Sequence, residues 1–239
     1  MRSSANLNII VKSIEKATFK TGRDFSELEI LQTNPVSANK FAVACIKRIK
    51  EVIAEDLLKM RPNYNIYFTD GDEIISNPNC EYSFLINAVD GQENLIRSIP
   101  DFTIAISLRH HENSILNPVA LAINKIIGSD LYYCEKGFGA FCGNRRIRVS
   151  KRSSKDSLIL ATDNNLSQNM IHDLKLERYS LRNYSCPTLD IAYLASSKID
   201  GIIFSKNNKS FNNFLLIALE AGGIVKDCGD SILISNGSF

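Results

Sequence analysis

The spacing of apolar residues changes from helical to strand-like near residue 62 of this chain, and that change limits the folds available to it. Residues 5–31 read as one long, polar-rich helical stretch that Pro35 ends. From Ala38 to Met60 apolar residues recur at helical spacing, until Arg61-Pro62-Asn63 stops the helix. The following apolar residues form short runs rich in Ile, Val, Phe and Tyr, as in successive strands. The pattern therefore predicts helices first and a strand-rich middle.

The second half of the chain alternates predicted strands and helices. The strands of the middle region are expected at residues 65–68, 83–89, 102–108, 117–123, 131–135 and 147–150. From about Ser157 onward, strands at 158–162, 179–185, 201–205, 224–227 and 232–235 alternate with helices at 166–176, 188–198 and 212–221. This order predicts layered sheets and helices, an α/β (α+β layered) fold. We expect N-terminal helices plus a large antiparallel sheet over 1–156 and an α/β half over 157–239, in one compact unit.

The net charge and the cysteine spacing argue against several classes of function. The formal net charge is +2 over 239 residues, which indicates neither nucleic-acid nor membrane binding through bulk electrostatics. A local basic cluster is interpreted as a solvated strand edge and loop; it comprises Arg145, Arg146, Arg148, Lys151, Arg152 and Lys155. Six scattered cysteines form no CxxC pair, so zinc-ligand spacing is absent. No apolar run reaches the roughly 18 residues that span a bilayer, and a cytoplasmic protein is expected.

Three segments, taken in order, resemble a known family. The first, Asn87-Ala88-Val89-Asp90-Gly91-Gln92-Glu93-Asn94-Leu95, is similar to the metal motif Asp-Pro-Leu-Asp-Gly-Thr-Thr-Asn-Phe. The second runs from Cys134 to Ala140 and continues to Ser150. The third combines Leu189-Asp190-Ile191-Ala192-Tyr193-Leu194-Ala195 with Ile199-Asp200-Gly201 and Glu220-Ala221-Gly222-Gly223. Their order and spacing over about residues 36–226 resemble the inositol monophosphatase family.

This resemblance implies a five-layer α-β-α-β-α sugar-phosphatase sandwich, a homodimer, and hydrolysis of phosphate monoesters with two or three Mg²⁺ ions. Such chemistry needs a cluster of carboxylates, since Mg²⁺ takes hard oxygen ligands in octahedral geometry. The residue types at the matching positions therefore test whether the chemistry is present.

Most matching metal positions have lost their carboxylate. The second aspartate of the central motif is Asp90, but the first is Asn87. The family's Glu-Glu pair falls at Asp70-Gly71, where Asp70 is a shortened candidate ligand and Asp72 or Glu73 substitutes if the loop shifts.

Two further family aspartates are replaced. The one at the upstream helix start becomes Asn39, and the late one, counted back from Glu220, becomes Ser210. No acidic residue occurs between Gly201 and Leu219, so this last loss cannot be repaired by local realignment. We expect a cleft lined by Asp70, Asn87, Asp90, Gln92 and Ser210, with metal binding at the first three weak or absent.

Substrate contacts implied by the resemblance change too. The water-positioning threonine is Gln92, so Asp70, Asp90 and Gln92 are the remaining catalytic candidates. The glutamate that grips an inositol hydroxyl falls at about Phe204, and the segment near the ring reads Ser185-Cys186-Pro187-Thr188-Leu189. The candidate substrate-binding residues are Gly91, Gln92, Glu93, Cys186 and Phe204.

Two hypotheses follow. The favoured one is a family member with weak or no phosphatase activity, kept as a binding or regulatory protein. The family's extragenic-suppressor branch works with the transcription machinery, which by analogy implies a protein partner. The alternative is a Mg²⁺-dependent phosphatase acting on inositol or sugar phosphates, with ligands relocated to Asp70, Asp72, Glu73, Asp90 and Glu93. Mg²⁺ is the expected cofactor if the chain is active, and no cofactor is expected otherwise.

Overall fold

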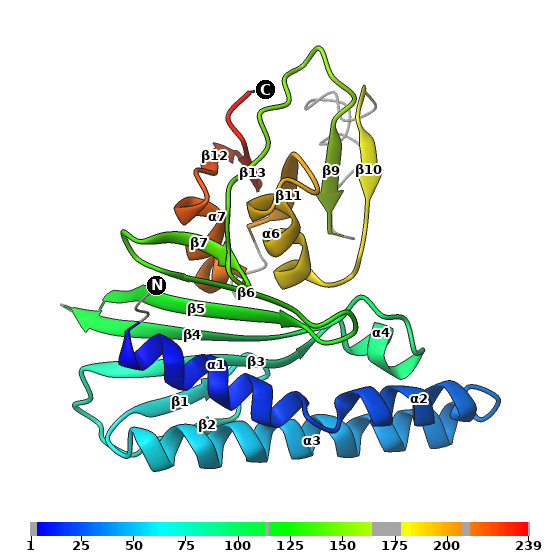
Figure 1. The fold of residues 1–239 in the computed structure, drawn as a ribbon, viewed down its shortest axis with the longest axis vertical. Helices are drawn as coiled ribbons and strands as arrows, with labels where there is room; N and C mark the ends of the chain where they lie inside the picture. The colour runs from blue at the N-terminus through cyan, green and yellow to red at the C-terminus, as the bar shows by residue number, and fades with distance from the viewer. Residues whose placement is uncertain (1–3, 113–114, 164–177, 207–210, 239) are drawn as a thin grey trace.

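Two β-sheets and the helices that flank them make up the protein (Figure 1). The computed structural model describes residues 4–112, 115–163, 178–206 and 211–238. Helices α1 (Ala5–Thr18), α2 (Thr21–Leu31) and α3 (Pro35–Met60) form one layer along the large sheet. Their buried side chains, among them Ile10, Ile14 and Ile53, share one hydrophobic core with strand residues such as Phe84 and Ile104.

The N-terminal helices differ from the sequence prediction in two places. The single helix predicted over 5–31 breaks at Phe19-Lys20, where the Thr18 hydroxyl donates to the carbonyls of Ile14 and Glu15. A hydroxyl bound in this way competes for the acceptors of the helix backbone. Pro35 begins α3 and does not end the preceding region. Proline is favoured in the first turn of a helix, and the Asn34 side chain caps this one by accepting from Ser37 N at 3.1 Å.

The large sheet has eight strands in the order β2-β1-β3-β4-β5-β6-β7-β8. They are β1 (Asn65–Phe68), β2 (Glu73–Ile74), β3 (Tyr82–Asp90), β4 (Thr103–Glu112), β5 (Ile115–Lys125), β6 (Asp130–Glu135), β7 (Gly139–Cys142) and β8 (Arg145–Ile147). Neighbouring strands of this sheet are antiparallel, except that β1 pairs with β3 in parallel. The β3–β4 register shifts between Asn87 and Asp90, so the strand is irregular where the central motif begins. Helix α4 (Gln92–Ile96) follows.

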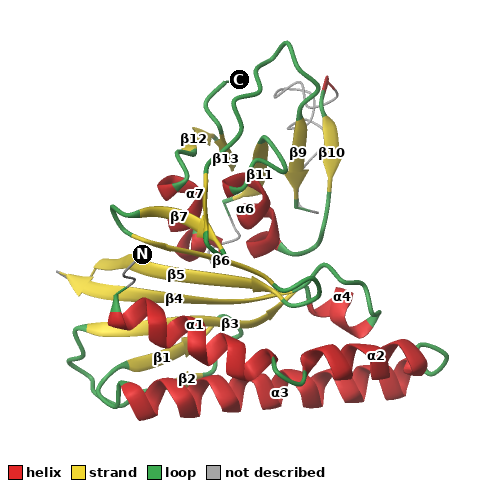
Figure 2. Cartoon of the chain, viewed as in Figure 1, coloured by secondary structure: helices red, strands yellow, loops and turns green. Residues whose placement is uncertain are grey.

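The small sheet has five strands in the order β10-β9-β11-β13-β12. They are β9 (Ile159–Thr162), β10 (Ser180–Arg182), β11 (Gly201–Ser205), β12 (Ile224–Cys228) and β13 (Ser231–Ser235). Helices α6 (Pro187–Ala195) and α7 (Leu216–Glu220) lie between the two sheets (Figure 2). A second core confirms this layer, because Ile191 of α6 and Ile217 of α7 belong to one cluster with Leu121 of β5 and Ile202 of β11.

Some predicted elements of this half change length. The strand predicted over 179–185 ends at Arg182, because the Asn183 side chain accepts from the Ser185 N–H and closes a turn. The helix predicted over 212–221 is a 3-10 turn, η2 (Phe211–Phe214), followed by the short α7. The helix predicted over 166–176 lies outside the described residues.

The layered α/β fold class is confirmed as helices, large sheet, helices and small sheet in succession (Figure 2). The division into residues 1–156 and 157–239 stays a prediction. Among the described helices, none has both the length and the apolar character that crossing a bilayer requires.

Candidate functional site

Asp90 ends β3 and is bound by the start of α6. Its Oδ2 accepts from Thr188 N and from Thr188 Oγ1, both at 2.7 Å, and lies 3.6 Å from Cys186 Sγ. Burial raises the pKa of Asp90 above its ordinary value, and hydrogen bonds from Thr188, Cys186 and Asn87 act in the opposite direction. The carboxyl group of Asp90 therefore joins the large sheet to α6.

Gly91 allows this close contact. Its φ is +76°, in the left-handed region that favours glycine, and a Cβ there would lie 3.0 Å from Asp101 O and 3.2 Å from Cys186 Cβ. Asn94, one turn later, donates to Asp101 O at 2.6 Å and to Tyr184 O at 2.7 Å. The segment that begins α4 is thus held against the segment that precedes α6.

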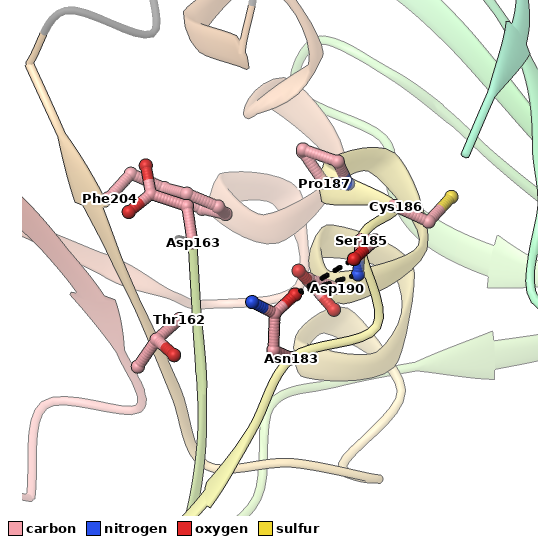
Figure 3. A pocket seen from close by; sticks show the side chains of 8 residues that line it. All are labelled: Thr162, Asp163, Asn183, Ser185, Cys186, Pro187, Asp190 and Phe204. Atoms are coloured by element: carbon pink, nitrogen blue, oxygen red, sulfur yellow. Dashed lines mark hydrogen bonds between the residues drawn. The ribbon is translucent and has the colours of Figure 1, made fainter. Parts of the chain in front are cut away.

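A cavity of about 230 Å³ opens beside the start of α6 (Figure 3). Its lining includes Cys186 and Phe204, two of the predicted substrate-binding residues, together with Asn183, Ser185 and Asp190. Phe204 is 2% exposed and gives one wall an apolar surface. Burial, and then the charge of Asp90, raise the pKa of the Cys186 thiol well above its ordinary value, which favours the protonated thiol that donates to Asp90.

Asp190 is a buried acid in the same lining. It is 2% exposed, and within the part of the chain that the structure describes its Oδ1 has no hydrogen-bond partner. Burial first, and then the charges of Asp90 and Asp101, raise the pKa of Asp190 well above its ordinary value. A neutral carboxyl group can donate a hydrogen bond to a bound acceptor, whereas a carboxylate can only accept hydrogen bonds.

A second cavity, of about 380 Å³, brings predicted residues together with unexpected ones. Asp70 and Gln92 line it with Asp72, Lys47 and Lys50. The Lys50 ammonium pairs with Asp70 Oδ2 and with Asp72 Oδ2, the latter at 2.6 Å. Although burial lowers it, hydrogen bonds and charge from these two carboxylates raise the pKa of Lys50 above its ordinary value.

Comparison with known proteins shows the family of this chain. The model of the inositol monophosphatase family matches residues 9–237. The chain belongs to this family. It is 28% identical over 233 residues to the inositol-1-monophosphatase of Rhizobium meliloti, covering 93% of this chain and 85% of that protein. It is 26% identical over 231 residues to the Nus factor SuhB of Vibrio cholerae, covering 92% and 84% respectively. The crystal structure of the extragenic suppressor protein suhB from Bartonella henselae has a TM-score of 0.82 at 26% identity, covering 98% of this chain and 95% of that one.

The Mg²⁺ that the inositol monophosphatase family implies does not fit the described side chains as they stand. Among residues 4–112, 115–163, 178–206 and 211–238, no three His, Cys, Asp or Glu side chains are grouped as metal ligands would be. Asp90 Oδ2 is engaged by Thr188, and Asp70 and Asp72 face an ammonium group. Mg²⁺ needs several oxygen ligands that are free to point at it.

The remaining predicted residues are dispersed. Asn39 is exposed on α3, and the eleven residues to Lys50 correspond to roughly 16 Å along the helix axis at about 1.5 Å per residue. Glu93 is exposed and pairs with Arg97 at 2.8 Å, while Glu73 is exposed in β2. Ser210 lies outside the described residues, so its predicted approach to Asp90 stays a prediction.

The sequence interpretation missed Lys50, the two hydrogen bonds that Thr188 donates to Asp90, and the buried Asp190. A signal for Lys50 existed, because Val43, Ile46, Lys47 and Lys50 follow the spacing of one helix face. No comparable signal existed for Thr188, since Asp90, which accepts its hydrogen bonds, lies 98 residues away along the chain. The acids whose charges act on Asp190 are Asp90 and Asp101, which are also remote in sequence.

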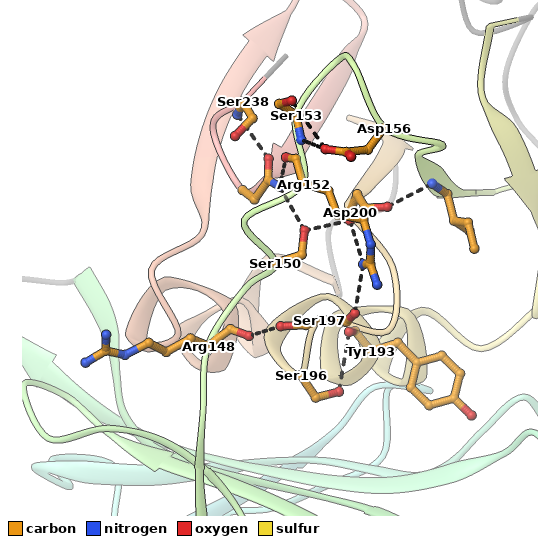
Figure 4. Close-up of polar contacts among 12 residues, drawn as sticks. Arg148, Ser150, Arg152, Ser153, Asp156, Tyr193, Ser196, Ser197, Asp200 and Ser238 are labelled. Carbon is orange, nitrogen blue, oxygen red and sulfur yellow. Dashed lines mark hydrogen bonds and ion pairs between the residues drawn. The ribbon is translucent and has the colours of Figure 1, made fainter.

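One more polar cluster lies outside both cavities (Figure 4). Asp200 is 1% exposed; its Oδ1 accepts from Ser150 Oγ at 2.6 Å and from Arg152 Nη1 at 3.1 Å, and its Oδ2 accepts from Ile159 N at 2.9 Å. Asn236 completes the cluster by donating to Ser150 Oγ. Arg152, a member of the predicted basic cluster, therefore forms an ion pair with a buried carboxylate.

Proposed function

We propose that this chain is an inositol-monophosphatase-like protein with weak or no phosphatase activity, retained as a binding or regulatory protein. The observation that carries the proposal is the state of Asp90, the acid of the central motif that the sequence retains. Its Oδ2 accepts two hydrogen bonds from Thr188, and its neighbour in the motif is Asn87. A carboxylate used to join two elements is poorly placed to hold a metal that activates water.

A phosphatase assay tests this directly. Purified protein would be assayed with Mg²⁺ on inositol, sugar and nucleotide monophosphates, beside the Rhizobium meliloti relative. We expect kcat/KM about 10³-fold or more below that relative, since loss of one group that stabilises the transition state costs about 10²–10³. Turnover within about tenfold of the relative would overturn the proposal.

The proposed partner is a protein, and by family analogy it belongs to the transcription machinery. Relatives named Nus factor SuhB and extragenic suppressor protein suhB support this choice over other partner classes. A homodimer is part of the same proposal, and sedimentation of the purified chain tests it.

The alternative, a Mg²⁺-dependent phosphatase with relocated ligands, is favoured by one observation. Asp70, Asp72 and Gln92 line a single cavity, so three oxygen-bearing side chains are already close together. The relatives named inositol-1-monophosphatase support the same alternative. If the assay finds efficient turnover that Asp70→Asn abolishes, this alternative replaces the first proposal.

A further inference from the structure

The Lys50 side chain lies where α3 meets the turn between β1 and β2. Its neighbour Ile49 is buried under the helix, and the Lys50 side chain itself is only 17% exposed. Its ammonium pairs with both Asp70 and Asp72 and lies 4.9 Å from the centre of the Phe68 ring. A long cationic side chain with this little exposure and two carboxylate partners is held in one place.

The turn presents its two carboxylates to this one cation. Gly71 N donates to Phe68 O at 3.1 Å, and Phe68 N donates to Asp72 O at 2.8 Å. Gly71 has a φ of +98°, in the left-handed region that favours glycine. The chain therefore reverses between Asp70 and Asp72, and both Oδ2 atoms reach the Lys50 ammonium.

Two carboxylates close together repel each other unless a cation lies between them. Here the cation is part of the chain. A divalent ion entering this cavity would have to displace the ammonium, which would then remain beside a second positive charge. The fold thus provides the compensation that a bound metal would otherwise provide.

We propose that Lys50 is the resident cation of this site: it occupies the carboxylates of Asp70 and Asp72, and it keeps a latent divalent-cation site closed. The inference rests on the proposed function, because it explains how the turn stays ordered without metal. Its test measures cation binding and thermal stability, not phosphatase activity. The inference can therefore fail while the phosphatase assay gives the expected result, and it can hold while that assay overturns the proposed function.

The experiment compares Lys50→Met with wild type by thermal unfolding, with and without about 10 mM Mn²⁺, and by calorimetric titration of Mn²⁺. Removing the ammonium leaves two adjacent carboxylates, so we expect a lower Tm without metal and a rise of about 2–4 °C on adding Mn²⁺. Mn²⁺ affinity should increase at least about tenfold over wild type. Wild type should shift by less than about 1 °C.

Lys47→Met is the matched control. Lys47 lies on the same helix and lines the same cavity, but its side chain is 77% exposed and its carboxylate partner, Glu51, is 3.9 Å away. It should gain no response to Mn²⁺. The double variant with Lys50→Met and Asp70→Asn should lose the response that Lys50→Met gains.

Three results would overturn the inference: a folded Lys50→Met with no response to Mn²⁺, an equal response in Lys47→Met, or a wild-type response as large as that of Lys50→Met. Lys50→Gln, which is neutral but keeps hydrogen-bond donors, serves if the Met variant is unfolded. If both variants stay unfolded with Mn²⁺ present, the inference is also wrong, because the metal should then replace the missing charge.

Discussion

Asp190 and Asp200 lie ten residues apart, at α6 and just before β11, and both are almost completely buried. Around Asp200, donors converge on both carboxylate oxygens: a hydroxyl, a guanidinium and a backbone N–H. Around Asp190, Oδ1 has no hydrogen-bond partner among the described residues, and the charges of Asp90 and Asp101 disfavour its ionised form. Equal burial therefore produces a paired carboxylate in one place and an acid with a raised pKa in the other.

The difference in hydrogen bonding indicates that Asp200 stabilises the fold and that Asp190 does not. A buried acid with all its donors stabilises its surroundings, while a buried acid without them costs free energy. Asp200 lies away from both cavities, whereas Asp190 lines the cavity that also contains Cys186 and Phe204. A buried polar atom without a partner is uncommon in native proteins, so Asp190 beside this cavity is a candidate for a functional role.

The largest effect is expected from substitution of Asp200, whose two carboxylate oxygens both accept hydrogen bonds. Asp200→Asn should lower the free energy of unfolding by about 3 kcal/mol, since one oxygen acceptor and the charge opposite Arg152 are lost from a buried cluster. Urea unfolding followed by circular dichroism measures this. A loss below about 0.5 kcal/mol would contradict the structural role given to Asp200.

Asp190→Asn should act with the opposite sign. An acid whose pKa is raised in the folded state loses stability as pH rises above its ordinary value of 3.8, because the unfolded chain ionises more readily. The neutral variant escapes this loss. We expect Asp190→Asn to be more stable than wild type by about 1–2 kcal/mol near pH 8, with the gain shrinking toward pH 4. Urea unfolding at several pH values, with Asp200→Asn as the matched control, decides the sign.

Substitution of Glu220 should have the smallest effect on stability, because this carboxylate is hydrogen-bonded, like that of Asp200, but only half-buried. Its half-buried carboxylate accepts from Gly137 N at 2.7 Å and from Gly139 N at 2.8 Å, which holds the β6–β7 turn against α7. Glu220→Gln keeps one acceptor oxygen and should cost about 1 kcal/mol. Amide hydrogen exchange at Gly137 and Gly139 should become faster; unchanged protection at both would argue against this contact.

Elements whose sequence was unambiguous were predicted closely. The strands at residues 65–68 and 201–205 have the predicted bounds, since each is a short apolar run between turn residues. Errors occurred where a local hydrogen bond changed the outcome, as at Thr18 in the broken helix and at Asn183 after β10. A periodic pattern carries no information about such side-chain contacts.

The sequence by itself predicted the family, through three motifs in order, and it predicted that several acids of the family's metal site are replaced, because residue type can be read directly. Only the tertiary structure decided what the remaining acids do. Lys50 reaches Asp70 because α3 packs along the sheet beside that turn, and Thr188 reaches Asp90 because α6 is inserted between the two sheets. Each contact joins residues that no local pattern relates, since packing of whole elements, and not spacing along the chain, sets the distance between them.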